Sequence, residues 1–475
     1  MIAAGLLRAS WMPPVLPMPS AGPPWELGVH VASHVVIWLL WIAGVLATAG
    51  VVAGLIAARR GQPVPLRALL VLAGVAIVAL TVVPPIGTTD PLDYAVYGHI
   101  VLIGHDPYTM TPYRFFLQTH TAGIPQDWQH TVSVYGPLAT GEEYLAARLG
   151  GSSLAATAFW LKLANALVFA AVAYGLDRLF RGDRAARVRV HMLWTANPLV
   201  IWSAIAGGHL DVLAAALGMA GLLILDRRGL QRPMLAALAA GLCIGVAADI
   251  KADYALFGLA VIWALWRKPR ELAMSAVGAM AVLVPSYALA GKFAVKALTV
   301  RAKTGQGWGF WKFIFWHLHL PLHYAVPTAA VLLVPVCWLA LRRLPQGFGG
   351  RPAVRAALAI SLAWLLVWPH QYAWYSIMVV CVLVLFPASR VDWLALAWLS
   401  ALTIADMPGL GLGQNKLLGP LLTNVEGTIV TKIEPVVMLA ALIALVIWCR
   451  NRRWNAAKAD PPGPWAAEPA GTSAA

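Results

Sequence analysis

The chain is poor in charged residues, in acids above all, and in cysteine. Only 12% of its 475 residues are charged, 20 are acidic, and the four cysteines are Cys243, Cys337, Cys381 and Cys449. The cysteines stand singly inside apolar runs, without the spacing of a zinc site or a disulfide framework, so we expect small packing residues and no metal. With 60% hydrophobic residues and a mean hydropathy of +0.72, the chain carries more apolar surface than a soluble domain needs.

Apolar runs near 20 residues long recur between residues 31 and 449. Each is long enough to cross about 30 Å of hydrocarbon as a helix. We therefore predict an all-α polytopic transmembrane helical bundle with about thirteen transmembrane helices in the cell membrane. The expected organisation is an N-terminal segment (1–30), a transmembrane domain (31–450) with an outer loop (86–152), and a disordered, Ala/Pro-rich cytoplasmic tail (451–475).

The net charge of +15 comes from basic clusters separated by pairs of predicted helices. The positive-inside rule places all of them in the cytoplasm, which predicts an outside N-terminus, an inside C-terminus and no nucleic-acid partner. The clusters lie at Arg59–Arg67, Arg181–Arg189, Arg227–Arg232, Arg267–Arg270, Arg342–Arg355 and Arg450–Arg453.

Most other polar clusters then fall on the outer face, although the orientation was assigned without them. They predict one site at the outer membrane surface. The clusters are Asp90 with Asp93, Gly207–Asp211, Asp249–Asp253, the long loop Lys292–His323, Trp368–Tyr372 and Asp406.

Asp90 and Asp93 stand one helical turn apart in the stretch TTDPLDYAVYGHIVLIGHDPY and can share a helix face. One interpretation is purely local, with Asp90 as the N-cap, Pro91 in the first helical position and Asp93 facing the macrodipole. The other is catalytic, because a carboxylate at the rim of a lipid-facing cavity is partly desolvated, which should raise its pKa toward the working range of a general base. We predict that one of the two acts as the base.

The stretch NPLVIWSAIAGGHLD combines a kink at Asn197-Pro198 with a glycine turn before His209 and Asp211. These two side chains either begin a helix after an ordinary turn or form a polar wall that positions a sugar or phosphate. Lys251, between Asp249 and Asp253, either neutralises these neighbours or binds an anion. Lys162, with Asn165 inside a predicted span, is either functional or reaches toward the interface.

The long outer loop mixes basic and aromatic residues, among them Arg301, Lys303 and Trp308. Its tryptophans could form an ordinary aromatic belt, but a lipid phosphate beside sugar-stacking rings fits the mixture better. His370 precedes a Tyr and Trp cluster and could also meet phosphate, or be a satisfied core histidine.

Three stretches together resemble the GT-C superfamily of membrane glycosyltransferases, in particular the actinobacterial polyprenol-phosphate-mannose-dependent α-mannosyltransferases and a related domain-of-unknown-function family. The first is DPLDYAVYGHIVLIGHDPY, where Asp90 matches the acid of the first outer loop, with His99 and Asp106 in place of Arg and Asn. The second is YGPL at Tyr135–Leu138. The third is NPLVIWSAIAGGHLD, with Leu210 replacing Asn.

The resemblance implies a GT-C fold and an inverting transfer of a sugar, most simply mannose, from a polyprenyl-phosphate donor to a glycan or glycolipid acceptor on the non-cytoplasmic face. One acid of the pair Asp90 and Asp93 would be the base, and no cofactor or metal would be required. The donor phosphate would meet Lys251, His370, Arg301 and Lys303, and the sugar or acceptor His209, Asp211, Tyr108, Tyr135 and Trp308.

A transporter or flippase of sugars or lipid-linked sugars is the main alternative. Transporters place polar residues near the bilayer midplane, and Lys162 is the feature that favours this interpretation. A structural membrane subunit, in which Asp90 only caps a helix, is a third possibility. The concentration of polar clusters at one rim favours the enzyme.

Overall fold

The structure is a computed structural model that describes residues 1–125, 128–225, 232–301, 309–344, 352–369, 371–407 and 419–450. Every regular element in these ranges is helical, which confirms the all-α prediction. Six helices are long and apolar enough to cross a membrane, or up to seven if one bent pair counts as a span. The protein is thus a helical membrane protein, while the number of thirteen spans and the orientation remain predictions.

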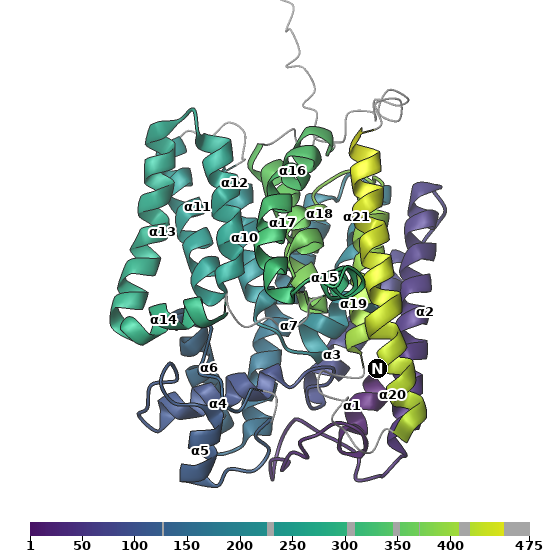
Figure 1. The fold of residues 1–475 in the computed structure, drawn as a ribbon, viewed down its shortest axis with the longest axis vertical. Helices are drawn as coiled ribbons and strands as arrows, with labels where there is room; N and C mark the ends of the chain where they lie inside the picture. Colours follow the sequence, from purple (N-terminus) through teal and green to yellow (C-terminus); the bar gives the residue numbers. More distant parts are fainter. Residues whose placement is uncertain are drawn as a thin grey trace, which may run out of the picture.

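The long apolar segments fold as predicted and run along the long axis of the molecule (Figure 1). They are α2 (Ser33–Arg59), α7 (Leu154–Leu179), α11 (Pro233–Ile250), α13 (Pro269–Ala290), η4 (Leu322–Tyr324) with α16 (Ala325–Arg343), and α20 (Gly419–Thr428) continuing through η8 (Ile429–Ile433) into α21 (Glu434–Arg450). Shorter apolar helices are α3 (Leu66–Val82), η3 (Ala252–Ala255) with α12 (Leu256–Leu265), α17 (Pro352–Val367), and η6 (Ala373–Tyr375) with α18 (Ser376–Leu383).

The bent pair contains the predicted break at Asn197-Pro198 and, further along the chain, a sharper bend. It consists of α8 (Arg184–Leu193), α9 (Pro198–Ile201) and η2 (Trp202–Ala206), followed after a bend of 115° by α10 (Asp211–Leu225). Asn197 caps α9 by accepting a hydrogen bond from the Leu199 amide at 3.1 Å, and Pro198 occupies the first turn. The bend itself contains Gly208, whose φ of +58° favours glycine.

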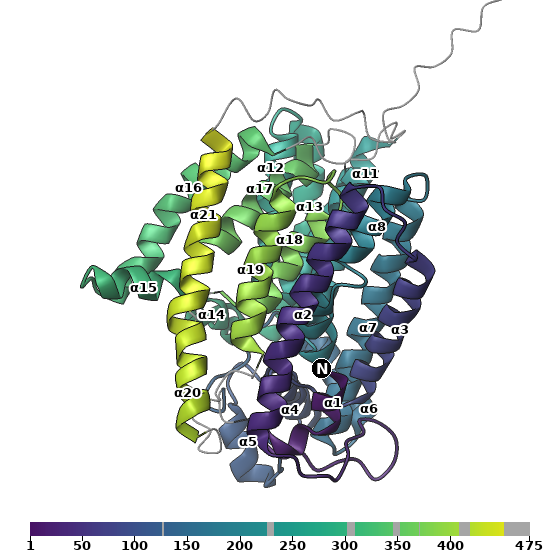
Figure 2. The same cartoon turned by 90° about the vertical axis from the view of Figure 1, so that its right-hand side faces the viewer.

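A group of shorter helices gathers at one end of the bundle, beside the N-terminus (Figures 1 and 2). It comprises α1 (Ile2–Leu6), η1 (Arg8–Ser10), α4 (Asp90–Leu102), α5 (Pro112–Thr119) and α6 (Pro137–Gly150). The remaining helices are α14 (Lys292–Arg301), α15 (Gly309–His317) and α19 (Val391–Asp406). None of α4, α5 and α6 is a candidate span, so the predicted outer loop is a small helical layer on the bundle.

The N-terminal segment packs against the loop that leads into α4. Arg8 is buried, and its guanidinium donates to the carbonyl oxygens of Pro85 at 2.9 Å and Pro14 at 2.6 Å. Trp11 is buried as well and donates from Nε1 to the Ala4 carbonyl at 2.9 Å. This segment therefore supports the loop before Asp90.

One residue of the predicted basic clusters is buried inside the bundle. Arg189 forms two hydrogen bonds with Asp392 of α19, at 2.9 and 2.6 Å, and Arg59 of α2 reaches the same carboxylate at 3.1 Å. Asp392 therefore ties α2, α8 and α19 together. Arg189 is therefore part of a buried ion pair, and only the remaining residues of its cluster bear on the orientation in the membrane.

Candidate active site

The helix α4 begins at Asp90, which corrects the expected capping role of this residue. Thr89 is the N-cap and forms no side-chain cap hydrogen bond, while the Asp90 amide donates to the Thr88 hydroxyl at 3.2 Å. Asp90 therefore lies inside the first turn, together with Pro91 and Asp93. Its carboxylate is not used as a cap, and the helix presents it and Asp93 to the same cavity.

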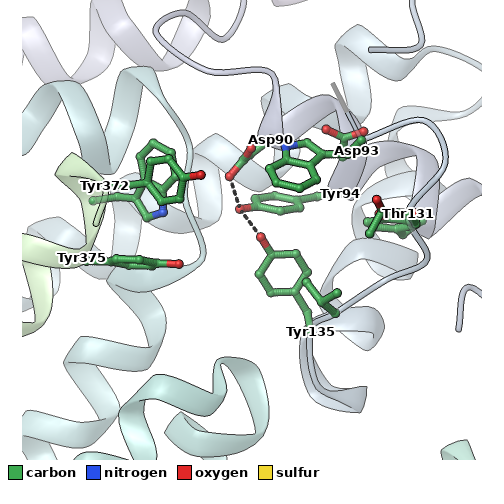
Figure 3. Close-up of a pocket in the computed structure, with 11 residues that line it drawn as sticks. Asp90, Asp93, Tyr94, Thr131, Tyr135, Tyr372 and Tyr375 are labelled. Carbon is green, nitrogen blue, oxygen red and sulfur yellow. Dashed lines mark hydrogen bonds between the residues drawn. The ribbon is translucent and has the colours of Figure 1, made fainter. Parts of the chain in front are cut away.

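This cavity is open to solvent, and the empty space between its walls, including the open mouth, is about 590 Å³. Two carboxylates and a predominantly aromatic wall surround it (Figure 3). Aromatic faces beside carboxylates suit a sugar, since the ring C–H groups pack on the aromatics and the hydroxyls meet the polar atoms. The lining residues are Asp90, Asp93, Tyr94, Tyr97, Trp128, Thr131, Val134, Tyr135, Tyr372, Trp374 and Tyr375.

A hydrogen-bonded chain leads from Asp90 along one wall of the cavity. The Tyr94 hydroxyl donates to Asp90 Oδ2 at 3.4 Å, and the hydroxyls of Tyr94 and Tyr135 are 3.1 Å apart (Figure 3). Because Tyr94 uses its single proton on Asp90, Tyr135 is the donor in the second bond. Burial raises the pKa of Tyr94 well above its usual value, so the phenol keeps this proton.

The predicted YGPL stretch places Tyr135 in this chain through a tight contact between α6 and α11. A Cβ atom on Gly136 would lie 1.5 Å from the Asp249 carbonyl oxygen, so only glycine fits. Asp249 in turn accepts a hydrogen bond from the Leu138 amide at 2.7 Å, which gives α6 a cap supplied by another helix. The Ser286 hydroxyl of α13 donates to the same carboxylate.

His209 also approaches Oδ2 of Asp90, and its ring is the first of three stacked rings. Its Nδ1 is 3.4 Å from Asp90 Oδ2, and this nitrogen has no partner with hydrogen-bond geometry among the described residues. The ring stacks on Trp374 with centroids 3.8 Å apart, and Trp374 stacks on Tyr372 at 4.6 Å. Asp406, at the end of α19, accepts from the Ala373 amide at 3.0 Å and so fixes the short helix η6.

The electrostatic balance keeps Asp90 ionised and lowers the pKa of its carboxyl, which corrects the expectation of a raised pKa. Burial by itself would raise the pKa of the carboxyl, but the proximity and charge of His209, the charge of Lys251 and the Thr88 hydroxyl together lower it below its usual value. Asp93 has acidic neighbours instead. Burial raises the pKa of Glu143, and the charges of Glu142 and Asp93 raise it further. Of the two carboxylates, Asp90 has the cationic surroundings.

Lys251 and Asp211 form a buried ion pair at the edge of this site. The ammonium of Lys251 is 2.6 Å from Asp211 Oδ2 and 4.4 Å from the ring centroid of Tyr375, and both charged side chains are 1% exposed. Tyr254 donates to the Asp211 carbonyl at 3.0 Å. The described ion pair of Lys251 is thus with Asp211, 40 residues away in the sequence, a partner that the sequence pattern did not predict.

The other predicted residues are more scattered. Tyr108 is buried outside the cavity, where its hydroxyl is 2.9 Å from Thr140 Oγ1. Lys303, Trp308 and His370 and the side chain of Arg301 lie outside the described residues. In the described part of the chain, no three His, Cys, Asp or Glu side chains are grouped as metal ligands.

The predicted set missed the aromatic wall: Tyr94, Tyr97, Trp128, Tyr372, Trp374 and Tyr375. The aromatic run after His370 was visible in the sequence. The sequence pattern of this run does not show which rings face a cavity. The run includes the short 3-10 helix η6, in which the consecutive residues Trp374 and Tyr375 both line the wall.

The contact between His209 and Asp90 leads to a pH prediction. If Asp90 is the base, activity falls as pH falls through its pKa, so the wild-type acid limb of kcat/KM should lie at or below about pH 4. His209→Gln removes an influence that lowers this pKa, while burial, which raises it, remains. The limb should therefore move to higher pH.

This pH profile should be measured on purified protein in detergent. His105→Gln is the matched control, because His105 is exposed and its ring nitrogen contacts only Gln118 among the described side chains. An unchanged acid limb in His209→Gln would mean that His209 does not set the charge state of the base.

The fold and the cavity together define a class: an integral membrane protein with an ionised carboxylate in an aromatic pocket at one end of the bundle. The comparison with known families gives the particular family. Residues 1–267 match the alpha-(1->6)-mannopyranosyltransferase family, N-terminal domain, and the chain belongs to this family. The match includes all three stretches that carried the resemblance, and it confirms the mannosyltransferase family inferred from them.

Curated relatives show the same similarity at lower coverage. The chain is 27% identical over 146 residues to a probable alpha-(1->6)-mannopyranosyltransferase of Mycolicibacterium smegmatis, covering 30% of this chain and 26% of that protein. It is 25% identical over 191 residues to alpha-(1->6)-mannopyranosyltransferase A of Corynebacterium glutamicum, covering 39% and 36%. The matches thus span about a quarter to a third of the length of these relatives.

Among solved structures, the chain is similar to ArnT from Cupriavidus metallidurans, which was crystallised bound to undecaprenyl phosphate. The sequence identity is 16%, the TM-score is 0.42, and the match covers 81% of this chain and 76% of that one.

Proposed function

We propose that the protein is an alpha-(1->6)-mannosyltransferase of the GT-C type that uses a polyprenyl-phosphate mannose donor and a glycan or glycolipid acceptor. The observation that carries the proposal is the ionised Asp90 in a cavity walled by tyrosine and tryptophan, in a chain of this family. The cavity lies at the junction between the bundle and the α4–α6 layer. In this proposal, the acceptor enters from the aqueous side and the donor is held by its lipid tail in the membrane.

The proposed reaction is a single displacement. Asp90 removes the proton from the C6 hydroxyl of the acceptor, and the oxygen attacks the anomeric carbon of the donor mannose. The bond from that carbon to the phosphate oxygen breaks, and polyprenyl phosphate leaves with the electron pair while Asp90 holds the proton. Polyprenyl phosphate is a good leaving group without a general acid, provided that cations stabilise the phosphate.

The proposed cations differ in how directly they reach the phosphate. Lys251 is already paired with Asp211 and does not line the described cavity, so we assign it an indirect part, fixing Asp211 and the Tyr375 ring. Direct contacts are assigned to Arg301, Lys303 and His370. Direct contacts with the sugar or acceptor are assigned to Tyr135 and Trp308. Tyr108 and Asp211 are assigned indirect roles, through the elements that they hold in place. His209 acts on the acceptor through Asp90.

The proposed setting is a multi-pass protein of the plasma membrane with about thirteen spans, N-terminus outside and C-terminus inside. The shorter apolar helices and the bent pair would supply the spans beyond the six long ones. Lys162, which favoured a transporter, does not line the described cavity, and its ammonium is bound to a backbone carbonyl. This arrangement supports the enzyme over the alternative.

The direct test uses purified protein in detergent with a mannose oligosaccharide acceptor and one of two donors, synthetic polyprenyl-phosphate mannose or GDP-mannose. We expect transfer from the lipid-linked donor alone, with an alpha-(1->6) product identified by mass spectrometry and linkage analysis. Transfer from GDP-mannose instead would contradict the assignment of a lipid donor. No transfer, but movement of the lipid donor across proteoliposomes, would favour the flippase.

The indirect part of Lys251 predicts rescue by a second substitution. Lys251→Met leaves the Asp211 carboxylate buried without its cation, which should lower the free energy of unfolding by about 3 kcal/mol and also lower activity. Adding Asp211→Asn removes the unpaired charge, so thermal stability and most of the activity should return. If stability returns but the KM for the lipid donor stays raised more than about tenfold, Lys251 contacts the phosphate directly.

A further inference from the structure

Two polar residues of the membrane-spanning helix α7 are buried directly behind the candidate active site. Lys162 is 0% exposed and Asn165 is 1% exposed, and they lie one helical turn apart. A lysine inside a membrane helix is costly, so its position needs a physical reason. No described acid pairs with Lys162. Its partner is a backbone carbonyl.

The two side chains bind the two segments that carry the candidate catalytic pair. Lys162 Nζ donates to the Val83 carbonyl at 2.7 Å, at the start of the loop that leads to Asp90. Asn165 Nδ2 donates to the carbonyl of His209 itself at 3.0 Å. One turn of one helix therefore holds both the Asp90 loop and the His209 turn.

The loop needs such support because of its sequence. Pro84 and Pro85 follow Val83, and neither has an amide hydrogen with which to anchor the backbone. The described anchors are Lys162 at Val83, Arg8 at Pro85 and the bond from the Ile86 amide to the Ala206 carbonyl at 3.1 Å. The third of these already joins the loop to η2, just before the His209 turn.

The stem of Lys162 also fills the space between the two segments. A Cβ atom on Gly208 would lie 3.0 Å from Lys162 Cγ and 3.1 Å from Pro91 Cγ, so lysine stem, glycine turn and α4 are packed closely together. A change in the lysine side chain would therefore alter the distance between Pro91 and Gly208. Pro91 is next to Asp90 in the sequence, and Gly208 is next to His209.

We infer that Lys162 and Asn165 are positioning residues that set the distance between the Asp90 carboxylate and the His209 imidazole. They touch neither substrate nor reacting atoms and act through the Val83 and His209 carbonyls. The inference rests on the proposed role of Asp90 as the base. An error in position of about 1 Å can lower a rate about 100-fold, so the effect should appear in kcat.

The kinetic test uses Lys162→Met and Asn165→Leu, which keep side-chain size and remove the donor. Both should lower kcat about 10- to 100-fold and change the KM for polyprenyl-phosphate mannose less than about threefold. Asn165→Leu is the more informative variant. Asn165 Oδ1 has no hydrogen-bond partner among the described residues, so removing it offsets the lost bond and Tm should stay within about 3 °C. Leu167→Ala, at a 64% exposed position of the same helix, is the control and should match the wild type.

A measurement without turnover separates the inference from the proposed function. In protein labelled with ¹³C-histidine, the His209 ring signal is assigned by its loss in His209→Gln. Asp90→Asn should shift this signal in the wild-type background, and the shift should fall to less than half in Asn165→Leu and in Lys162→Met. An equal shift in all three backgrounds, or wild-type kcat in Asn165→Leu, would overturn the inference. A different result is that the wild type transfers no mannose while the shift caused by Asp90→Asn is still reduced in the two variants. This result would refute the proposed function and leave the positioning role intact.

Discussion

Asp90→Asn is expected to lower kcat for mannose transfer by about 100-fold or more, because it removes the group that accepts the proton from the acceptor hydroxyl. The substitution keeps the size of the side chain and the hydrogen bond from Tyr94, since the Asn oxygen can still accept it. Asp90 is not the N-cap of α4, so no cap is lost. The purified variant should therefore fold normally, and the loss should appear in kcat at saturating donor.

Asp93→Asn is the matched comparison. It lines the same cavity from the same helix, but it lies beside the acid Glu143, whereas Asp90 lies 3.4 Å from the His209 imidazole. We expect a loss of less than about tenfold. If Asp93→Asn loses more activity than Asp90→Asn, the roles of the two carboxylates are reversed.

Gly136→Ala should produce the second large effect, on both stability and turnover. The added methyl would lie 1.5 Å from the Asp249 carbonyl oxygen, which belongs to the backbone of α11 and cannot rotate away. The start of α6 must therefore move away from α11, which should cost about 3 kcal/mol in the free energy of unfolding. Tyr135 moves with it and leaves its hydrogen bond to Tyr94, so kcat should fall by about 10-fold or more.

The control is Gly141→Ala, five residues further along α6. A Cβ atom at Gly141 would meet no heavy atom within 4 Å, so alanine should stabilise the helix by about 0.5–1 kcal/mol and leave turnover unchanged. Thermal unfolding and the mannose-transfer assay on both variants test the pair. Equal Tm values for the two variants would mean that the contact between Gly136 and Asp249 is not a fixed part of the fold.

The helices of the bundle could be predicted from the sequence because each long apolar run has to satisfy its own backbone in lipid. α7, α11 and α13 lie within a few residues of the apolar runs that predict them, at 153–178, 232–248 and 271–290. The N-cap of α4 is Thr89, one residue before the predicted N-cap Asp90. The sequence Thr88-Thr89-Asp90 offers three capping residues in a row, and tertiary contacts decide which one is used.

The site could be predicted only where its residues were close in sequence or shared a face of the membrane. Asp90 and Asp93 follow from helical spacing. The positive-inside rule predicts one side of the membrane for the Asp90, His209 and Lys251 segments, and the structure brings these segments together. The partner of Lys251 could not be predicted, because the pairing with Asp211 is long-range and depends on the 115° bend before α10. The part of Asp249 was hidden for the same reason, since its partner is the start of α6.

The most direct test of the account is the stereochemistry of the transfer. A single displacement with Asp90 as base inverts the anomeric carbon, so an alpha-linked product requires a beta-linked donor. The measurement compares synthetic polyprenyl-phosphate mannose of the two anomeric forms, with NMR of the product linkage. We predict an alpha-(1->6) product from the beta-linked donor and none from the alpha-linked donor. An alpha-linked product from the alpha-linked donor would contradict the account, since retention would require a covalent intermediate on a carboxylate.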